Sequence, residues 1–319
     1  MKTGRSLLLS ALCYACGLAA LLPGSASAVI IGTGDGTQNT TQGSMPAGWN
    51  YVGTFGGPNS GVYLGNGWGI TAAHIGSIPA SASFILPSGT FTTDQPGILL
   101  KNPDNSDTDL QLFHLSSNPA LASLSISGTT PLATTPIFMV GFGRDPRDAN
   151  PVYYDVSGDP TNPDWKADAN PLTANEGGFH YGVNQLKRWG TNTVNPGGPV
   201  VVDVGGRNVT AFFADFYTNK DAYLANPNGA TPFEAIASAG DSGGGVFDGS
   251  NTLLGVMNAV DGITNEPADT AFFGFNTYMA DLSAYRPQIV AITAVPEPSA
   301  AAVVLIGAAG LALRRARRR

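Results

Sequence analysis

Residues 239–245 have the sequence Ala-Gly-Asp-Ser-Gly-Gly-Gly, which places Ser242 in the middle of a run of small residues. Glycines on both sides allow the backbone to form a tight turn, so that the serine hydroxyl is exposed and neighbouring backbone N–H groups point toward one place. Nucleophilic attack on a carbonyl group needs both features, because the attacked oxygen becomes negatively charged. A Gly-Asp-Ser-Gly run also occurs in ordinary turns. Its meaning therefore depends on partner residues elsewhere in the chain.

Two upstream segments supply partners for this serine. Residues 68–74 are Trp-Gly-Ile-Thr-Ala-Ala-His, an apolar strand that runs into His74. Residues 109–115 are Asp-Leu-Gln-Leu-Phe-His-Leu, a second apolar strand that starts at Asp109. These motifs, and their order along the chain, resemble those of the trypsin/chymotrypsin-like serine proteases. In the serine motif only Gly245 departs from the family's usual GDSGGP, and the resemblance covers roughly residues 50–290.

The resemblance implies a fold and roles for individual residues. The implied fold is all-β, with two six-stranded Greek-key β-barrels of the chymotrypsin-like kind and a short C-terminal helix. Ser242 would be the nucleophile, His74 the general base, and Asp109 the residue that orients the histidine. The backbone N–H groups of Gly240 and Ser242 would form the oxyanion hole. Asp107 is the second candidate for the acid, and Asp109 is preferred because it directly precedes the apolar strand.

The residues that select the substrate are expected around the nucleophile turn. In trypsins an aspartate six residues before the nucleophile selects Lys or Arg, and this chain has Ile236 there. An apolar floor cannot pair a buried cation, so we expect an apolar or small residue before the cleaved bond. Asn258, Ala259 and Val260 resemble the strand that lines the family's pocket. Glu234 is the alternative, since a register shift of two residues would restore selection of a cation.

The composition favours an all-β protein and argues against several classes of function. The chain has 319 residues, 43% of them hydrophobic and 12% charged, with 41 Gly and 23 Pro between short apolar runs. A net charge of −7 and sparse basic residues argue against nucleic-acid binding. Asp104, Asp107 and Asp109 lack the ordered Gly and the distal Glu of a calcium loop. We therefore predict no metal, and no motif indicates a cofactor.

Both ends of the chain have features of export signals. Residues 1–28 have a basic start, an apolar centre and the ending Ala-Ser-Ala, as secretory signal peptides do. Both cysteines lie in this segment, so we expect no disulfide in the exported chain. Residues 295–319 contain Val-Pro-Glu-Pro-Ser, an apolar run and an arginine cluster, which resembles the PEP-CTERM sorting signal of Gram-negative bacteria. The alternatives are an N-terminal membrane anchor and a disordered basic tail.

The sorting signal implies a route out of the cell. Its apolar run would be a C-terminal membrane helix that anchors the chain transiently, with the arginines held in the cytoplasm. In the family that carries this signal, a membrane transpeptidase called an exosortase is thought to cut at the Pro-Glu-Pro motif. We therefore expect an exosortase-type processing enzyme as a partner. The expected location is the cell surface or the extracellular space.

Between these signals we predict two domains. Residues 29–135 form the N-terminal barrel and residues 136–294 the C-terminal barrel, with a long insertion at about 144–196 that is rich in Asp, Asn and Pro. The insertion either forms a wall of the substrate cleft or decorates the surface, and the second interpretation is favoured. After export, Val29 would be the new N-terminus. In the protease family a freed terminus pairs with the aspartate before the nucleophile, which is Asp241 here. The alternative, a flexible leader, is slightly favoured because residues 32–43 are all small or polar.

Three functions fit these motifs. The leading hypothesis is a secreted serine endopeptidase that hydrolyses peptide bonds in protein or peptide substrates through an acyl-enzyme. The second is a catalytically silent matrix protein that uses the protease fold for binding, and the presence of His74, Asp109 and Ser242 argues against it. The third is a serine esterase with the same three side chains, which a comparison of peptide and ester substrates would separate from the first.

Overall fold

The computed structural model describes residues 29–45, 47–57 and 59–294. Among these residues, no helix is both long and apolar enough to cross a membrane. The predicted signal peptide at 1–28 lies outside the described residues, and so does the predicted sorting signal at 295–319 with its membrane helix.

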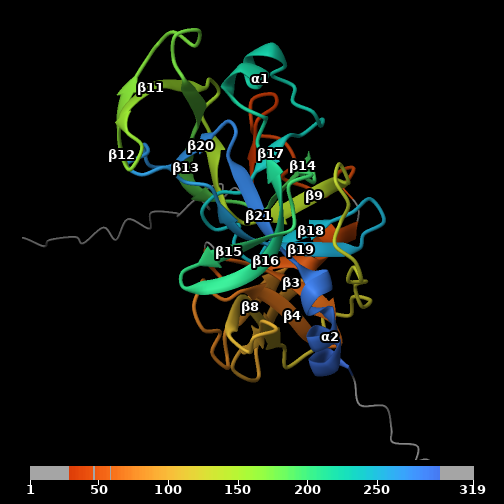
Figure 1. Cartoon of the computed structure of the whole chain (residues 1–319). Coiled ribbons are helices and arrows are strands. Elements are labelled where there is room, and N and C mark those ends of the chain that lie inside the picture. The colour runs from red at the N-terminus through yellow and green to blue at the C-terminus, as the bar shows by residue number, and fades with distance from the viewer. Residues whose placement is uncertain (1–28, 46, 58, 295–319) are drawn as a thin grey trace, which may run out of the picture.

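The first barrel is a seven-stranded antiparallel sheet with the strand order β6-β5-β2-β3-β4-β8-β7, in the lower part of Figure 1. It closes on itself where Thr93, just after β6, pairs with Leu115, just after β8. Segments β6 and β7 therefore form one side of the barrel together. The strands of this sheet are β2 (Val52–Thr54), β3 (Ser60–Gly65), β4 (Trp68–Ala72), β5 (Ser83–Leu86), β6 (Gly89–Thr92), β7 (Ile98–Lys101) and β8 (Asp107–His114).

The second barrel is also built on a seven-stranded antiparallel sheet, in the order β14-β9-β18-β19-β21-β16-β15. It closes where the N–H of Asn195 donates to the carbonyl of Phe213 at 2.8 Å. This bond joins the end of β14 to β16, so β15 is an additional strand that pairs with β16. The strands of this sheet are β9 (Pro136–Gly141), β14 (Arg188–Thr193), β15 (Val200–Val204), β16 (Arg207–Asp215), β18 (Gly245–Phe247), β19 (Leu253–Val260) and β21 (Asn276–Asp281).

Each barrel thus has six strand positions, and the fold is the chymotrypsin-like double β-barrel that the sequence predicted. The predicted C-terminal helix is α2 (Leu282–Thr293), which begins after Asp281. The Asp281 carboxylate accepts a hydrogen bond from the N–H of Ser283 at 3.0 Å and so caps the helix. From the last strand of the second barrel, α2 returns to the first barrel, where the Gln288 side chain accepts from the N–H of Lys101 at 2.8 Å.

Apolar packing between the barrels places the functional residues. All residues from 108 to 113 in β8 are buried, because one face of this strand points into the first barrel and the other meets β16 of the second barrel. Inside the first barrel Phe84 and Phe113 pack with ring centroids 4.7 Å apart. Inside the second barrel Phe212 and Met279 are fully buried. At this junction β4 lies against β19, and β8 lies against β16.

The insertion is an ordered sheet. Its strands β10 (Arg144–Arg147), β13 (Glu176–Gln185), β11 (Val152–Asp159) and β12 (Asn162–Ala167) form an antiparallel ladder in this order, which projects from the second barrel at the top of Figure 1. Strand β13 also pairs with β20 (Thr270–Phe272), which belongs to the segment after the predicted pocket strand.

The aromatic side chains Tyr154 and Phe179 of the insertion pack with Phe272 of β20, and the interpretation of the insertion as surface decoration stays a prediction. The predicted range also ended too late, since β14 at 188–193 already belongs to the second barrel. The remaining short elements are β1 (Ile30–Ile31), the 3-10 helix Ala47–Tyr51, α1 (Lys220–Ala225) and β17 (Ala235–Ile236).

Candidate active site

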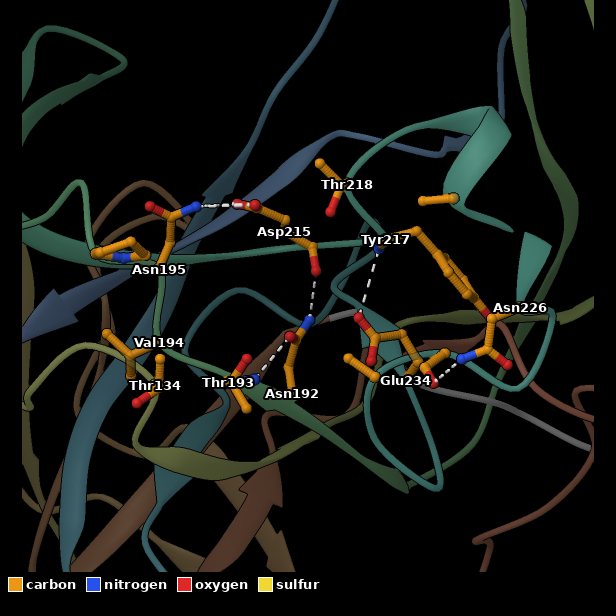
Figure 2. Close-up of a pocket in the computed structure, with 14 residues that line it drawn as sticks. Thr134, Asn192, Thr193, Val194, Asn195, Asp215, Tyr217, Thr218, Asn226 and Glu234 are labelled. Atoms are coloured by element: carbon orange, nitrogen blue, oxygen red, sulfur yellow. Dashed lines mark hydrogen bonds between the residues drawn. The ribbon is translucent and has the colours of Figure 1, made fainter. Parts of the chain in front are cut away.

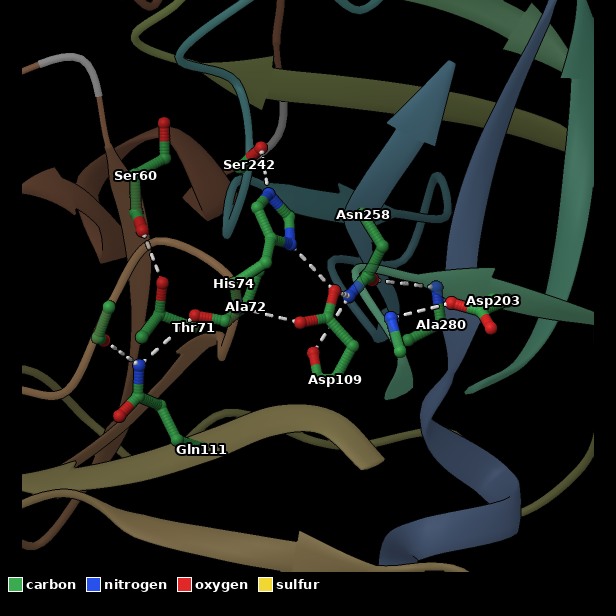
Figure 3. Close-up of polar contacts among 12 residues, drawn as sticks. Ser60, Thr71, Ala72, His74, Asp109, Gln111, Asp203, Ser242, Asn258 and Ala280 are labelled. Carbon is green, nitrogen blue, oxygen red and sulfur yellow. Dashed lines mark hydrogen bonds and ion pairs between the residues drawn. The ribbon is translucent and has the colours of Figure 1, made fainter. Parts of the chain in front are cut away.

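The fold brings His74, Asp109 and Ser242 together at the junction of the barrels (Figure 3). His74 follows β4, Asp109 lies in β8, and Ser242 lies in the turn before β18. The Nε2 atom of His74 is 2.7 Å from the hydroxyl oxygen of Ser242. Its Nδ1 atom is 2.7 Å from Oδ2 of Asp109, and its backbone N–H donates to Oδ1 of Asp109 at 2.7 Å. The three predicted side chains thus form one continuous line of hydrogen bonds.

The surroundings of Asp109 decide which histidine nitrogen carries the proton. A carboxylate oxygen accepts hydrogen bonds, so the Nδ1 atom of His74 is the donor and Nε2 is left to accept from the serine hydroxyl. Asp109 is completely buried, whereas the His74 side chain is 26% exposed. Asp107, the second candidate for the acid, instead pairs with Lys101 on the surface. The choice of Asp109 over Asp107 as the neighbour of His74 is therefore correct.

Asn258 has a part in this arrangement that the sequence analysis missed. Its side-chain N–H₂ group donates to Oδ2 of Asp109 at 2.7 Å and to the backbone carbonyl of the same residue at 2.8 Å. Its own carbonyl oxygen accepts from the N–H of Ala280 at 3.2 Å. Asn258 therefore ties the buried carboxylate to β19 and β21 of the second barrel. From its position in an apolar strand, Asn258 was predicted to line the pocket, but this position does not indicate the contact with Asp109.

The nucleophile turn is held from both barrels. From β3, the N–H of Ser60 donates to the carbonyl of Ser242 at 2.9 Å, and the Ser60 hydroxyl donates to the carbonyl of Gly240 at 3.0 Å. A Cβ atom at Gly243 would lie 2.1 Å from the Ser60 carbonyl oxygen, and Gly243 has a φ of +87°. Only glycine fits there, because the two backbones approach too closely for a side chain.

The predicted oxyanion donors are the backbone N–H groups of Gly240 and Ser242. In the part of the chain that the structure describes, the backbone N–H groups of Gly240 and Ser242 have no protein acceptor. Gly240 has a φ of +103°, a conformation that a residue with a side chain rarely adopts. Neither N–H group is therefore engaged within the described part of the chain, as the predicted role requires.

A cavity of about 200 Å³ opens beside the nucleophile. No charged side chain is among its lining residues, which are Ala237, Ser238, Ala239, Ser242, Met257, Asn258, Ala259 and Val260. Three of the four predicted pocket residues are thus in place. The fourth, Ile236, is not: its strand β17 pairs with β1, and its side chain is 1% exposed in an apolar cluster with Ile30 and Phe272.

Glu234, the alternative selector of a cation, lies in another cavity. This second cavity has a volume of about 300 Å³ and is lined by Asn192, Asp215 and Tyr217 among others (Figure 2). The Glu234 carboxylate accepts from the N–H of Tyr217 at 3.4 Å and from the N–H of Thr231 at 3.1 Å. Burial raises the pKa of this carboxyl. Glu234 does not line the cavity beside Ser242, so the register-shift alternative is wrong.

The first described residue, Val29, contacts Asp241, the residue before the nucleophile. The backbone nitrogen of Val29 donates to Oδ1 of Asp241 at 3.3 Å. Val29, Ile30 and Ile31 are fully buried, and the latter two pair with β17. These residues are therefore not a flexible leader. Asp241 is itself fully buried and accepts from the N–H of Gly143 at 2.9 Å and from that of Ser238 at 2.7 Å. Burial raises the pKa of Asp241 to about 6.

Comparison with known proteins finds distant similarity to solved structures. No known family model and no curated protein sequence matches it. Among solved structures, a Glu endopeptidase is similar, with a TM-score of 0.45 and 17% identity over 84% of this chain and 100% of that one. Kallikrein-related peptidase 10 has a TM-score of 0.43 and 16% identity over 77% of this chain and 96% of its own. The MamO protease domain from Magnetospirillum magneticum has a TM-score of 0.39 and 15% identity, covering 73% and 88%.

Proposed function

We propose that this protein is a serine endopeptidase that works through an acyl-enzyme. The observation that carries the proposal is the unbroken line from Asp109 through His74 to Ser242, with 2.7 Å at both contacts of the imidazole. A serine hydroxyl is a weak nucleophile at neutral pH and needs a base in hydrogen-bond contact. Here the base is in contact, and a buried carboxylate fixes its tautomer.

In the proposed reaction, each group moves a proton or holds a charge. The Ser242 oxygen attacks the peptide carbonyl while His74 Nε2 takes the hydroxyl proton. The carbonyl oxygen becomes negative and is held by the N–H groups of Gly240 and Ser242, each worth roughly 3–4 kcal/mol in such sites. His74 then gives its proton to the leaving amine, which breaks the C–N bond. A water molecule, deprotonated by the same nitrogen, hydrolyses the ester and restores the serine.

The cavity beside the nucleophile supports a preference for small or apolar residues before the cleaved bond. Its volume is about 200 Å³, and its lining of small, apolar and neutral polar residues offers no opposite charge to a cationic or anionic side chain. We therefore expect cleavage after residues such as Ala or Val in a peptide library. A dominant preference for Lys, Arg or Glu would contradict this assignment.

Turnover of matched substrates tests the proposal against its two competitors. The protein should hydrolyse both a peptide and the corresponding ester, and Ser242→Ala should lower both rates by at least about four orders of magnitude. Ester hydrolysis without peptide hydrolysis would favour the esterase. A folded wild-type chain that starts at Val29 and hydrolyses neither substrate would favour the silent binding protein.

We further propose that a free amino group at Val29 activates the site. The supporting observation is the contact of the Val29 nitrogen with the buried carboxylate of Asp241, the residue next to the nucleophile. An α-ammonium group there would pair with a carboxylate whose charged form is otherwise destabilised by burial. Cleavage after residue 28 would release that group. Activity should then require a chain that starts at Val29, and equal activity in an extended chain would argue against activation.

Export and sorting are proposed from the sequence of the two ends. Residues 1–28 would direct export, and residues 295–319 would anchor the chain until an exosortase-type enzyme cuts at the Pro-Glu-Pro motif. Mass spectrometry of the protein isolated from the cell surface or medium tests both steps. The expected protein starts at Val29 and ends near residue 296. A chain that keeps either end would contradict the corresponding step.

A further inference from the structure

One buried arginine of the insertion sheet holds the N-terminal segment. Arg147, the last residue of β10, is 4% exposed. Its Nε and Nη2 atoms donate to the backbone carbonyls of residues 31–34, at distances between 2.6 and 3.3 Å. The guanidinium also lies over the ring of Phe179 in β13, 3.8 Å from its centroid. A single side chain thus gathers four successive peptide groups onto the insertion.

The contact is too specific to be a by-product of packing. The segment turns around the arginine at Gly36, where φ is +75° and a Cβ atom would lie 2.5 Å from Cγ of Arg147. The Nη1 atom donates to the carbonyls of Asp148 and Ala149, the two residues that follow β10, and so fixes the guanidinium beside its own backbone. Burying a charge is costly unless its N–H groups are paired. Here the carbonyls of the N-terminal segment supply much of that pairing.

The held segment leads directly to the nucleophile turn. At the start of this segment Ile30 and Ile31 pair with β17, and the backbone N–H of Val29 donates to Oδ1 of Asp241. Asp241 precedes Ser242, so the location of the segment sets what the buried carboxylate contacts. Both cysteines of the chain lie outside the described residues. No disulfide can therefore fasten the described part of this segment, and hydrogen bonds and packing must do so.

We propose that Arg147 is a positioning residue of the active site: it fastens residues 31–34 to the insertion sheet and so seats Val29 against Asp241. The inference rests on the proposed peptidase function and gives the insertion a role in it. The insertion thus holds the N-terminal segment in place through Arg147. When the arginine is lost, the N-terminal segment leaves its place more often, and the nucleophile turn loses the contact behind it.

Two measurements on a chain that starts at Val29 test the proposal, with Arg147→Gln compared to wild type. The matched control is Arg207→Gln, which makes the same change of charge on the β15–β16 hairpin. Hydrogen exchange of the amides of residues 30–34 should become at least about tenfold faster in Arg147→Gln, because each hydrogen bond to a charged group contributes a factor of that order. The rate of fluorophosphonate labelling of Ser242 and kcat should fall by a similar factor, with KM nearly unchanged. Arg207→Gln should match wild type.

A reciprocal measurement separates positioning from simple stabilisation. If segment docking favours the reactive turn, then covalent modification of Ser242 must favour docking by the same coupling free energy. Labelled Arg147→Gln should therefore regain much of the lost exchange protection at residues 30–34. Arg147→Lys, which keeps the charge but not the fork of donors, should lie between the two forms.

Each outcome has a definite meaning. Unchanged exchange in Arg147→Gln would refute the claim that Arg147 fastens residues 31–34. Faster exchange with unchanged kcat would show that the contact is structural and does not position the active site. If the wild type neither reacts with the fluorophosphonate nor cleaves peptides, the peptidase proposal fails, while the exchange comparison still tests whether Arg147 fastens residues 31–34.

If Arg147→Gln does not fold, Phe179→Leu keeps the hydrogen bonds and removes the ring beneath the guanidinium. It should show the same changes to a smaller degree, and an absence of change would count against the proposal.

Discussion

Because of Asp241, the free energy of unfolding should depend on pH, and this dependence should differ between a chain that starts at Val29 and one that is longer at its N-terminus. The carboxyl is fully buried, and burial raises its pKa from 3.8 to about 6 when the Val29 nitrogen is an ordinary peptide N–H. The folded state then binds the proton more tightly than the unfolded state. The free energy of unfolding therefore falls as the pH rises through the window from 3.8 to about 6. A shift of about two units corresponds to a loss of about 3 kcal/mol above that window.

A chain that starts at Val29 should behave differently. Its α-ammonium group would lie beside the carboxylate and favour the charged form, which lowers the pKa of Asp241 and removes the loss of stability. Urea unfolding at several pH values between 4 and 7 compares this chain with one extended back to Ala26, both carrying Ser242→Ala to prevent self-cleavage. Asp241→Asn should remove the difference in pH slope between them. Identical slopes in the two chains with Asp241 intact would refute the reasoning.

Three substitutions test other parts of the site. Asn258→Ala leaves the triad carboxylate without a side-chain donor from β19, so kcat should fall by about tenfold or more in steady-state assays; unchanged kcat would exclude a positioning role. Val260→Gly enlarges the cavity and should shift library preference from Ala toward Phe by about tenfold, and an unchanged profile would remove Val260 from the pocket wall. Gly243→Ala forces a Cβ atom to 2.1 Å from the Ser60 carbonyl oxygen and should cost about 2 kcal/mol or more in urea unfolding. Gly249→Ala, which meets nothing within 4 Å, should be nearly neutral, and an equal cost in both would contradict the close approach.

The sequence predicted the parts of the site that depend on local motifs. His74 follows a strand, Asp109 lies near the start of another, and Ser242 lies in a glycine turn; their order along the chain matched a known arrangement. The two-barrel fold followed from this resemblance and from short apolar runs between turns. Strand β8 was recognisable from the apolar residues Leu110, Leu112 and Phe113, and in the structure all residues from 108 to 113 are buried.

The misses come from contacts between distant segments. Ile236 stood at the family's pocket position, but pairing with Ile30 turned its side chain into a different cluster. Counting residues back from the nucleophile cannot show such a pairing. The roles of Asn258 and Ser60 are also set by partners in the other barrel, and a single polar residue in an apolar strand does not name its partner.

The strands inside the insertion were not predicted, for a different reason. Strands β11 and β12 leave many side chains exposed on both faces, so their sequence lacks the alternation of apolar and polar residues that marks a half-buried strand. The buried part of the sheet depends on the pairing of β13 with β20, far along the chain. Aspartate, asparagine and proline between these strands then made the whole range resemble a loop.

The most direct test of the central claim is the site of reaction with a fluorophosphonate. The line of hydrogen bonds from Asp109 to Ser242 should make this one hydroxyl reactive, so tryptic peptide mapping should find a single adduct on Ser242. His74→Ala should slow its formation by several orders of magnitude, because the hydroxyl then has no base. An adduct on another serine, or labelling of Ser242 at the same rate without His74, would contradict the account.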